Sequence, residues 1–113
     1  MKIKRGNLYL ANLNPRHGTE AGKYRPVVVI QNDLLNEAGH TSTWVIPCTT
    51  QVLPINFIRV RLPKASAGNA KECDVMIDQS RSIDNTRFKK EMGSIPSILF
   101  EEIIEKLRLA GDF

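Results

Sequence analysis

Short segments of alternating hydrophobic and polar residues, separated by turn-forming residues, run through the first two thirds of the chain. Residues 6–13 form the first strand-like segment, and residues 14–18 close it with a turn. Residues 27–30 are continuously aliphatic, which is typical of a strand covered on both faces. We therefore predict a mostly β protein in which residues 27–30 belong to the central strand.

The next two segments continue this pattern. Residues 33–36 predict a turn of helix with Asp33 as its cap, and residues 43–46 resume extended structure. Pro47 has no backbone N–H to donate, so we expect it to end or bulge that strand.

Residues 57–62 alternate and predict a strand with one aliphatic and one basic face. The aliphatic face would carry Ile58, Val60 and Leu62, and the other Phe57, Arg59 and Arg61. Residues 63–71, rich in Ala, Gly, Ser and Lys, predict a mobile loop. Residues 75–77 and 88–95 predict further short strands.

The last segment has helical periodicity. Ser94 and Pro96 announce a helix, and Gly111 ends it. Its apolar face carries Leu99, Ile103 and Leu107, and its water-facing positions are Glu101, Glu102, Glu105 and Lys106. The whole pattern predicts an α+β fold that is mainly β: a strongly bent sheet or small barrel with a C-terminal amphipathic helix docked beside it.

Composition is ordinary, but the charge is unevenly distributed. The chain has 113 residues, 42% hydrophobic and 25% charged, so we expect one folded domain spanning residues 1–113. Its net charge of +4 divides into +7 for residues 1–90 and −3 for residues 91–113. The cationic part is where a polyanion would bind.

Several kinds of site are disfavoured. The longest aliphatic run is far shorter than the roughly 20 residues of a membrane span, and the N-terminus lacks a signal peptide's apolar region, so we expect a cytoplasmic protein without membrane contact. Cys48 and Cys73 are isolated and predict reduced structural thiols. Asp74 and Asp78 are the nearest acidic pair, and the histidines have no ligand spacing. We expect no metal ion and no cofactor.

Polar residues gather at the ends of the predicted strands. They occur in three strings, which follow one another in the order RGNLYLANLNPRHGTEAGKYRPVVVIQND, VIPCTTQ and DQSRSIDNTR. Together these strings span residues 5–87, and they resemble the MazF/PemK family of toxin endoribonucleases in wording and order.

The resemblance implies a small SH3-like barrel of the CcdB/PemK type. It also implies a symmetric homodimer and a cognate antitoxin protein that blocks the RNA groove. The implied activity is sequence-selective, metal-independent cleavage of single-stranded RNA, chiefly mRNA. Attack by the 2′-hydroxyl would leave a 2′,3′-cyclic phosphate and a 5′-hydroxyl.

The family's site residues carry over to matching positions. The catalytic positions correspond to Arg25, in the RP motif, and Thr49, in the PCTTQ motif. The RNA-binding positions correspond to Thr19, Glu20, Thr50, Gln51, Gln79 and Arg81. Thr19 stands where serine is commoner in the family, so the RNA sequence preference does not carry over.

The chemistry is also reasonable without the family. RNA carries its own nucleophile, so an enzyme need only align it and stabilise charge on the phosphate oxygens. Arg25 offers a planar cationic fork, and the Thr49 hydroxyl offers a further donor. The general base stays open between Arg25 itself, His17, Glu20 and a water molecule.

Simpler interpretations remain beside these. Thr49 or Thr50 could be structural strand residues, Asp78 and Asp84 could serve only hydrogen bonds or ion pairs, and Trp44 fits the core better than a base-stacking platform. Two other functions also stay open. One is a non-catalytic toxin of the same fold that inhibits DNA gyrase by protein contact, and the other is an RNA-binding module without cleavage.

Overall fold

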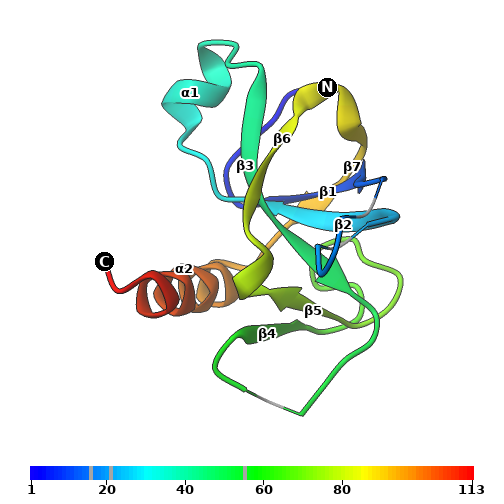
Figure 1. The fold of residues 1–113 in the computed structure, drawn as a ribbon, viewed down its shortest axis with the longest axis vertical. Helices are drawn as coiled ribbons and strands as arrows, with labels where there is room; N and C mark the ends of the chain where they lie inside the picture. Colours follow the sequence, from blue (N-terminus) through cyan, green and yellow to red (C-terminus); the bar gives the residue numbers. More distant parts are fainter. Residues whose placement is uncertain (16, 21, 55) are drawn as a thin grey trace.

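Seven antiparallel strands form one strongly bent sheet in the part of the chain that the structure describes, and a C-terminal helix packs against it (Figure 1). The structure is a computed structural model that describes residues 1–15, 17–20, 22–54 and 56–113. The strands are β1 Asn7–Asn12, β2 Tyr24–Val29, β3 Ser42–Thr49, β4 Arg59–Leu62, β5 Cys73–Met76, β6 Arg81–Asp84 and β7 Phe88–Ser94. The helices are α1 Asp33–Glu37 and α2 Ser97–Gly111, with 3₁₀ turns η1 Ile77–Gln79 and η2 Asn85–Arg87. The predicted α+β fold is confirmed.

Strand β2 is central, as predicted. The sheet order is β4-β5-β3-β2-β1-β7, with β6 beside β3. Val28 packs into the core shared with α2, whereas Val27 and Val29 pack into a second core on the opposite face. All three valines are fully buried. Because successive side chains of a strand alternate between faces, two cores require a continuous aliphatic run.

Strand β3 changes partner along its length. Val45 pairs with Arg81 of β6, and Thr49 pairs with Asp74 of β5. The two β3 residues are four positions apart, whereas their partners are seven positions apart. The three extra residues of the partner segment correspond in number to the turn η1. Pro47 lies in this interval and pairs with Val27 of β2. The expectation that Pro47 ends or bulges β3 was wrong, because β3 continues to Thr49 and the extra residues lie in the segment that joins β5 to β6. Since that segment does not pair with Pro47, the missing backbone N–H of the proline leaves no hydrogen bond unmade.

The ends of both helices differ in detail from the prediction. Asn32, not Asp33, caps α1, because its side chain accepts a hydrogen bond from the Leu34 amide at 2.8 Å. Asp33 is the first helical residue. Gly111 is the last residue of α2, and Asp112 beyond it takes the left-handed conformation that closes the helix.

Residues 63–71 form a packed loop, so the prediction of a mobile one was wrong. Asn69 is buried, and its amide nitrogen donates to the carbonyls of Pro63 (3.1 Å) and Lys71 (2.8 Å). Gly68 has φ +80° and lies so close to the Met92 carbonyl that a Cβ would overlap it. The loop is therefore fastened to β7 by backbone contact that only glycine permits.

Helix α2 docks through the predicted apolar face, with Ile103 and Leu107 buried in the first core. Lys106 differs from its predicted water-facing position. Its ammonium donates to the carbonyls of Arg59 (2.7 Å) and Asn56 (3.2 Å), which ties the helix to the start of β4. Trp44 is also not a core residue: it is 38% exposed, because its outward position on β3 alternates with buried neighbours.

The buried carboxylate of Asp74 binds the segment between β3 and β4 through hydrogen bonds. Asp74 is 1% exposed and accepts hydrogen bonds from the Leu53 amide (2.9 Å), Arg59 Nη1 (3.3 Å) and Arg61 Nε (2.7 Å). Burial alone would raise the pKa of Asp74. The hydrogen bonds and the two guanidinium charges outweigh that effect and hold the pKa below its ordinary value of 3.8.

Helix docking is tested by a pair of substitutions on α2. Ile103 is fully buried and Ile98 is 78% exposed. We expect Ile103→Ala to lower the free energy of unfolding by about 3 kcal/mol through the lost burial and the cavity left behind. Ile98→Ala should change it by less than about 0.5 kcal/mol. Urea denaturation of the three proteins measures both values, and equal effects would contradict this packing.

The Asp74 network predicts how stability depends on pH. A carboxyl with a lowered folded-state pKa stabilises the fold above its unfolded pKa, and the contribution is lost as the pH falls through the folded value. We expect Asp74→Asn to cost about 2 kcal/mol at pH 7, less than for a fully buried ion pair because both arginines are partly exposed. The difference between variant and wild type should shrink below pH 4. Thermal unfolding at pH 7 and pH 3 measures it, and a constant difference would refute the ionised role of Asp74.

Candidate active site

The register between β2 and β3 brings Arg25 and Thr49 together. The β2–β3 ladder runs to the pair Val27 and Pro47, and Arg25 and Thr49 lie two residues beyond that pair on their respective strands. The Arg25 side chain donates from Nε to the Gly22 carbonyl (2.7 Å) and from Nη1 to the Cys48 carbonyl (3.4 Å). These bonds hold the guanidinium beside the end of β3.

Thr49 is held equally firmly. It is 7% exposed, and its hydroxyl oxygen accepts a hydrogen bond from the Gln51 amide at 3.1 Å, which turns the chain as it leaves β3. A hydroxyl that accepts in this way keeps its own proton to donate. The pair thus presents a fixed cation and a hydroxyl donor on one surface.

Two clefts meet at this pair. The larger, of about 500 Å³, is lined by Asn14, Gly22, Lys23, Tyr24, Arg25, Thr49, Thr50 and Gln51. The smaller, of about 200 Å³, is lined by Thr19, Glu20, Arg25, Thr49, Gln51, Arg59, Met76 and Gln79. Arg25, Thr49 and Gln51 line both. Seven of the eight residues predicted for the site therefore surround one continuous surface.

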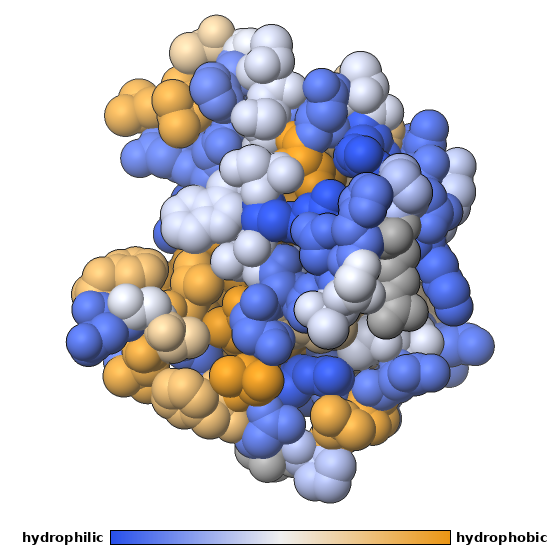
Figure 2. Space-filling view, viewed as in Figure 1, coloured by the Kyte–Doolittle hydropathy of each residue, from blue (hydrophilic) through white to orange (hydrophobic). Residues whose placement is uncertain are grey.

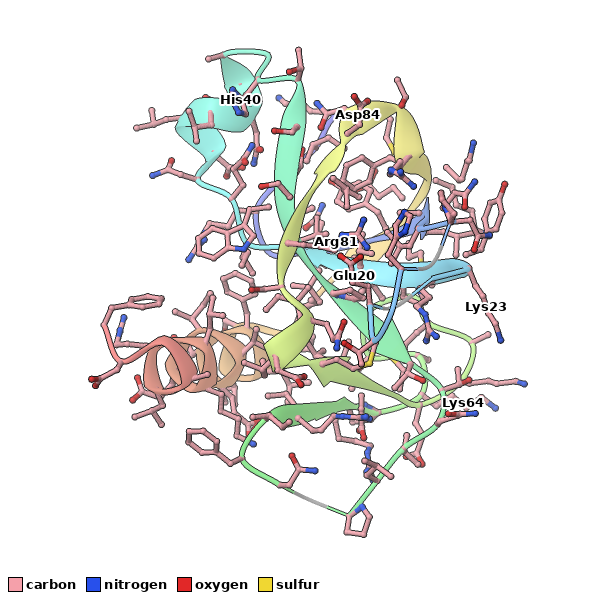
Figure 3. The ribbon with its side chains drawn as sticks, in the orientation of Figure 1. Glu20, Lys23, His40, Lys64, Arg81 and Asp84 are labelled. Atoms are coloured by element: carbon pink, nitrogen blue, oxygen red, sulfur yellow. The ribbon has the colours of Figure 1, made fainter. Side chains whose placement is uncertain are left out.

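Arg81 is the predicted residue that lines neither cleft. It begins β6, just after η1, and Figure 3 labels it on that strand, whereas Glu20 comes from the loop before β2. Gln79 reaches the smaller cleft from η1 itself. Gln79 therefore belongs to the looped-out turn, whereas Arg81, two residues later, begins the next strand.

Sequence reasoning missed several residues of the lining. Lys23 and Tyr24 adjoin the RP motif, and Asn14 lies in the turn before it, yet none was predicted as a site residue. Lys23 has φ +67°, and its amide donates to the Asn14 side chain at 2.8 Å. Arg59 was placed on a basic face without a role. Proximity to the RP motif could have indicated Lys23, Tyr24 and Asn14, and the alternating arginines of residues 57–62 could have indicated Arg59.

The cleft walls are hydrophilic and carry more positive than negative charge. Arg25, Lys23 and Arg59 contribute cations, and Glu20 contributes the carboxylate of the smaller cleft. Figure 2 shows hydrophilic residues covering the face over β2 and β6, whereas apolar residues gather along α2. Such a surface suits a polyanion with polar bases.

The described ranges contain neither a cluster of metal-ligating side chains nor a helix suited to crossing a membrane. Outside residues 16, 21 and 55, no three His, Cys, Asp or Glu side chains lie close enough to share a metal ion. Over the same residues, neither helix combines the length and hydropathy required to cross a bilayer.

The chain resembles known toxins over its whole length. Residues 4–110 match the model of the PemK-like, MazF-like toxins of type II toxin–antitoxin systems. Endoribonuclease EndoA of Bacillus subtilis strain 168 is 30% identical over 111 residues, covering 97% of this chain and 95% of that protein. A crystal structure of MazF from Deinococcus radiodurans superposes with a TM-score of 0.86 at 23% identity, covering 100% and 99% of the two chains. A MazE-MazF crystal structure from the same organism gives 0.80 at 23% identity, covering 100% and 98%. The chain therefore belongs to the PemK-like, MazF-like family of type II toxins.

Proposed function

We propose that this protein is a metal-independent endoribonuclease that cleaves single-stranded mRNA at selected sequences. The observation that carries the proposal is that Arg25 and Thr49 line the same two polar clefts. The family membership and the relative named as an endoribonuclease support it.

The reaction needs few groups from the protein. The 2′-hydroxyl gives up its proton as its oxygen attacks the adjacent phosphorus, the bond to the 5′-oxygen breaks, and that oxygen takes up a proton from water, so the products are a 2′,3′-cyclic phosphate and a 5′-hydroxyl. Negative charge grows on the phosphate oxygens as this happens. The Arg25 guanidinium neutralises that charge, and the Thr49 hydroxyl donates a further hydrogen bond to it. Because both groups are already fixed, little reorganisation is needed.

Proton transfer requires a group that accepts the proton of the 2′-hydroxyl. Glu20 lines the smaller cleft with Arg25 and Thr49, whereas His17 lines neither cleft. Of the candidate bases, Glu20 is therefore the side chain that the geometry favours, directly or through a water molecule.

RNA contacts extend along both clefts from the reacting phosphate. Thr19, Gln51 and Gln79 on the smaller cleft, and Thr50 on the larger, offer hydrogen-bonding groups to bases and sugars. Arg81, two residues beyond Gln79, is a further proposed RNA contact.

The proposed partners follow from the family. A toxin of this class is paired with an antitoxin, and a MazE-MazF complex is among the structural matches. We propose that a cognate antitoxin covers the clefts, that the active protein is a homodimer, and that both act in the cytoplasm, where mRNA is present.

The mechanism predicts cleavage without divalent ions and a strict requirement for the ribose hydroxyl. We expect the purified protein to cut a long transcript in excess EDTA and to leave the same sequence uncut when it is made of DNA. Mapping both ends of each fragment checks the cyclic phosphate and 5′-hydroxyl. Inhibition by EDTA that a divalent ion reverses would contradict the metal-free mechanism, and binding without fragments would indicate a non-catalytic RNA-binding module.

The roles of the central pair predict graded losses of activity. Arg25→Ala should lower the cleavage rate by about 10³-fold, and Thr49→Val by about 10²-fold, since each removes a donor to the developing charge. Lys89→Ala removes a cation from an exposed position of β7, outside both clefts, and this variant should cleave RNA at the normal rate. Single-turnover rates at saturating enzyme provide the measurement. A near-normal rate for Arg25→Ala would remove it from the active site.

A further inference from the structure

The buried carboxylate of Asp74 contacts Arg59, a lining residue of the smaller cleft, and this cleft should attract a polyanion. A negative charge at this position therefore requires an explanation. Asp74 is 1% exposed, and its register on β5 sets it directly opposite Arg61 and two residues from the partner of Arg59. Both arginines therefore lie on its face of the β4–β5 pair. A carboxylate buried here would be costly without them.

The two arginines use Asp74 differently. Arg61 donates to Asp74 Oδ1 and to the Leu53 carbonyl, and it lines a separate depression near α2. Arg59 donates from Nη1 to Asp74 Oδ2 and to the Gln51 carbonyl, both at 3.3 Å, and it lines the smaller cleft beside Arg25 and Thr49. Arg59 also lines the depression near α2, but of the two arginines it is the one that reaches the smaller cleft as well.

Arg59 is fixed at its backbone as well as at its side chain. Its carbonyl accepts the bond from Lys106 of α2, and its strand pairs with β5 at Met76. A guanidinium has five N–H donors, and the two bonds at Nη1 occupy two of them. A planar fork anchored at one nitrogen can direct its other donors at a phosphate without losing side-chain entropy on binding.

We propose that Arg59 binds an RNA backbone phosphate adjacent to the reacting one, and that Asp74 is the positioning residue that directs it there. This inference rests on the proposed RNA-cleaving function. It assigns the smaller cleft a second phosphate position, in addition to the one at Arg25. Asp74 then contributes to RNA affinity although it is negative and does not touch the RNA.

The sign of one effect separates positioning from simple electrostatics. Asp74→Asn removes a negative charge from the neighbourhood of a polyanion site, so charge alone predicts tighter RNA binding. Loss of the anchor predicts weaker binding, because Arg59 must then be ordered by the RNA itself. A purely structural role would lower stability and leave the affinity of the folded protein unchanged.

The experiment measures binding without cleavage. The probe is a mixed-sequence RNA with 2′-fluoro riboses, which lack the nucleophile, and its dissociation constant is measured at several salt concentrations. Arg59→Ala should weaken binding by about tenfold and lower the slope of log affinity against log salt by about 0.7, the value for one phosphate contact on a single strand. Asp74→Asn should weaken binding several-fold with the slope unchanged, and it should add no loss in an Arg59→Ala background.

Controls make each outcome decisive. Lys89→Ala, which also removes one cation, should preserve both affinity and slope. Arg59→Lys keeps the charge but not the planar fork, so its RNA affinity should fall while its slope of log affinity against log salt stays the same. If Asp74→Asn does not fold, this variant tests the positioning of the guanidinium instead. An unchanged slope for Arg59→Ala, or tighter binding by folded Asp74→Asn, would overturn the proposal. Because the probe cannot be cut, these results stand apart from cleavage of ordinary RNA, whose absence would refute the proposed function instead.

Discussion

The antiparallel register of β2 against β3 is the constraint on which the rest of the molecule depends. It is held by side chains on both faces of β2, since Val28 packs into one core and Val27 and Val29 into the other. A slip by one residue would turn each of these valines toward the wrong core. Arg25 and Thr49 lie two residues beyond the last pair of this ladder, one on each strand. The packing that fixes the ladder therefore also fixes the strand ends that carry the proposed catalytic pair.

Much of this arrangement could be predicted from the chain because it depends on local pattern. The aliphatic run of β2, the alternation of β4 and the helical period of α2 each reflect which faces are covered, and the structure confirms all three. The RP and PCTTQ motifs lie at the ends of strands that such patterns reveal. That Arg25 and Thr49 belong to one site was an expectation from the resemblance to the toxin family.

The features that escaped prediction depend on contacts between distant segments. Strand β6 and the η1 turn follow from where β3 exchanges one partner for another, and no local period records that exchange. The order of the 63–71 loop depends on Asn69 and on the approach of β7 to Gly68. The burial of Asp74 could not be predicted from local sequence, because its arginine partners come from β4 and those partners decide whether a carboxylate can be buried.

The η1 turn has a consequence for how such a protein could diversify. The residues of η1 do not pair with β3, and one of them, Gln79, lines the smaller cleft. Substitutions at Gln79 would alter the group presented to nucleotide bases while the ladders on either side stay in register, whereas Ile77 of the same turn is fixed by its burial in the first core. The fold thus separates the strand ends that carry Arg25 and Thr49 from the residue at position 79, so that a change in base preference would require no change in strand pairing.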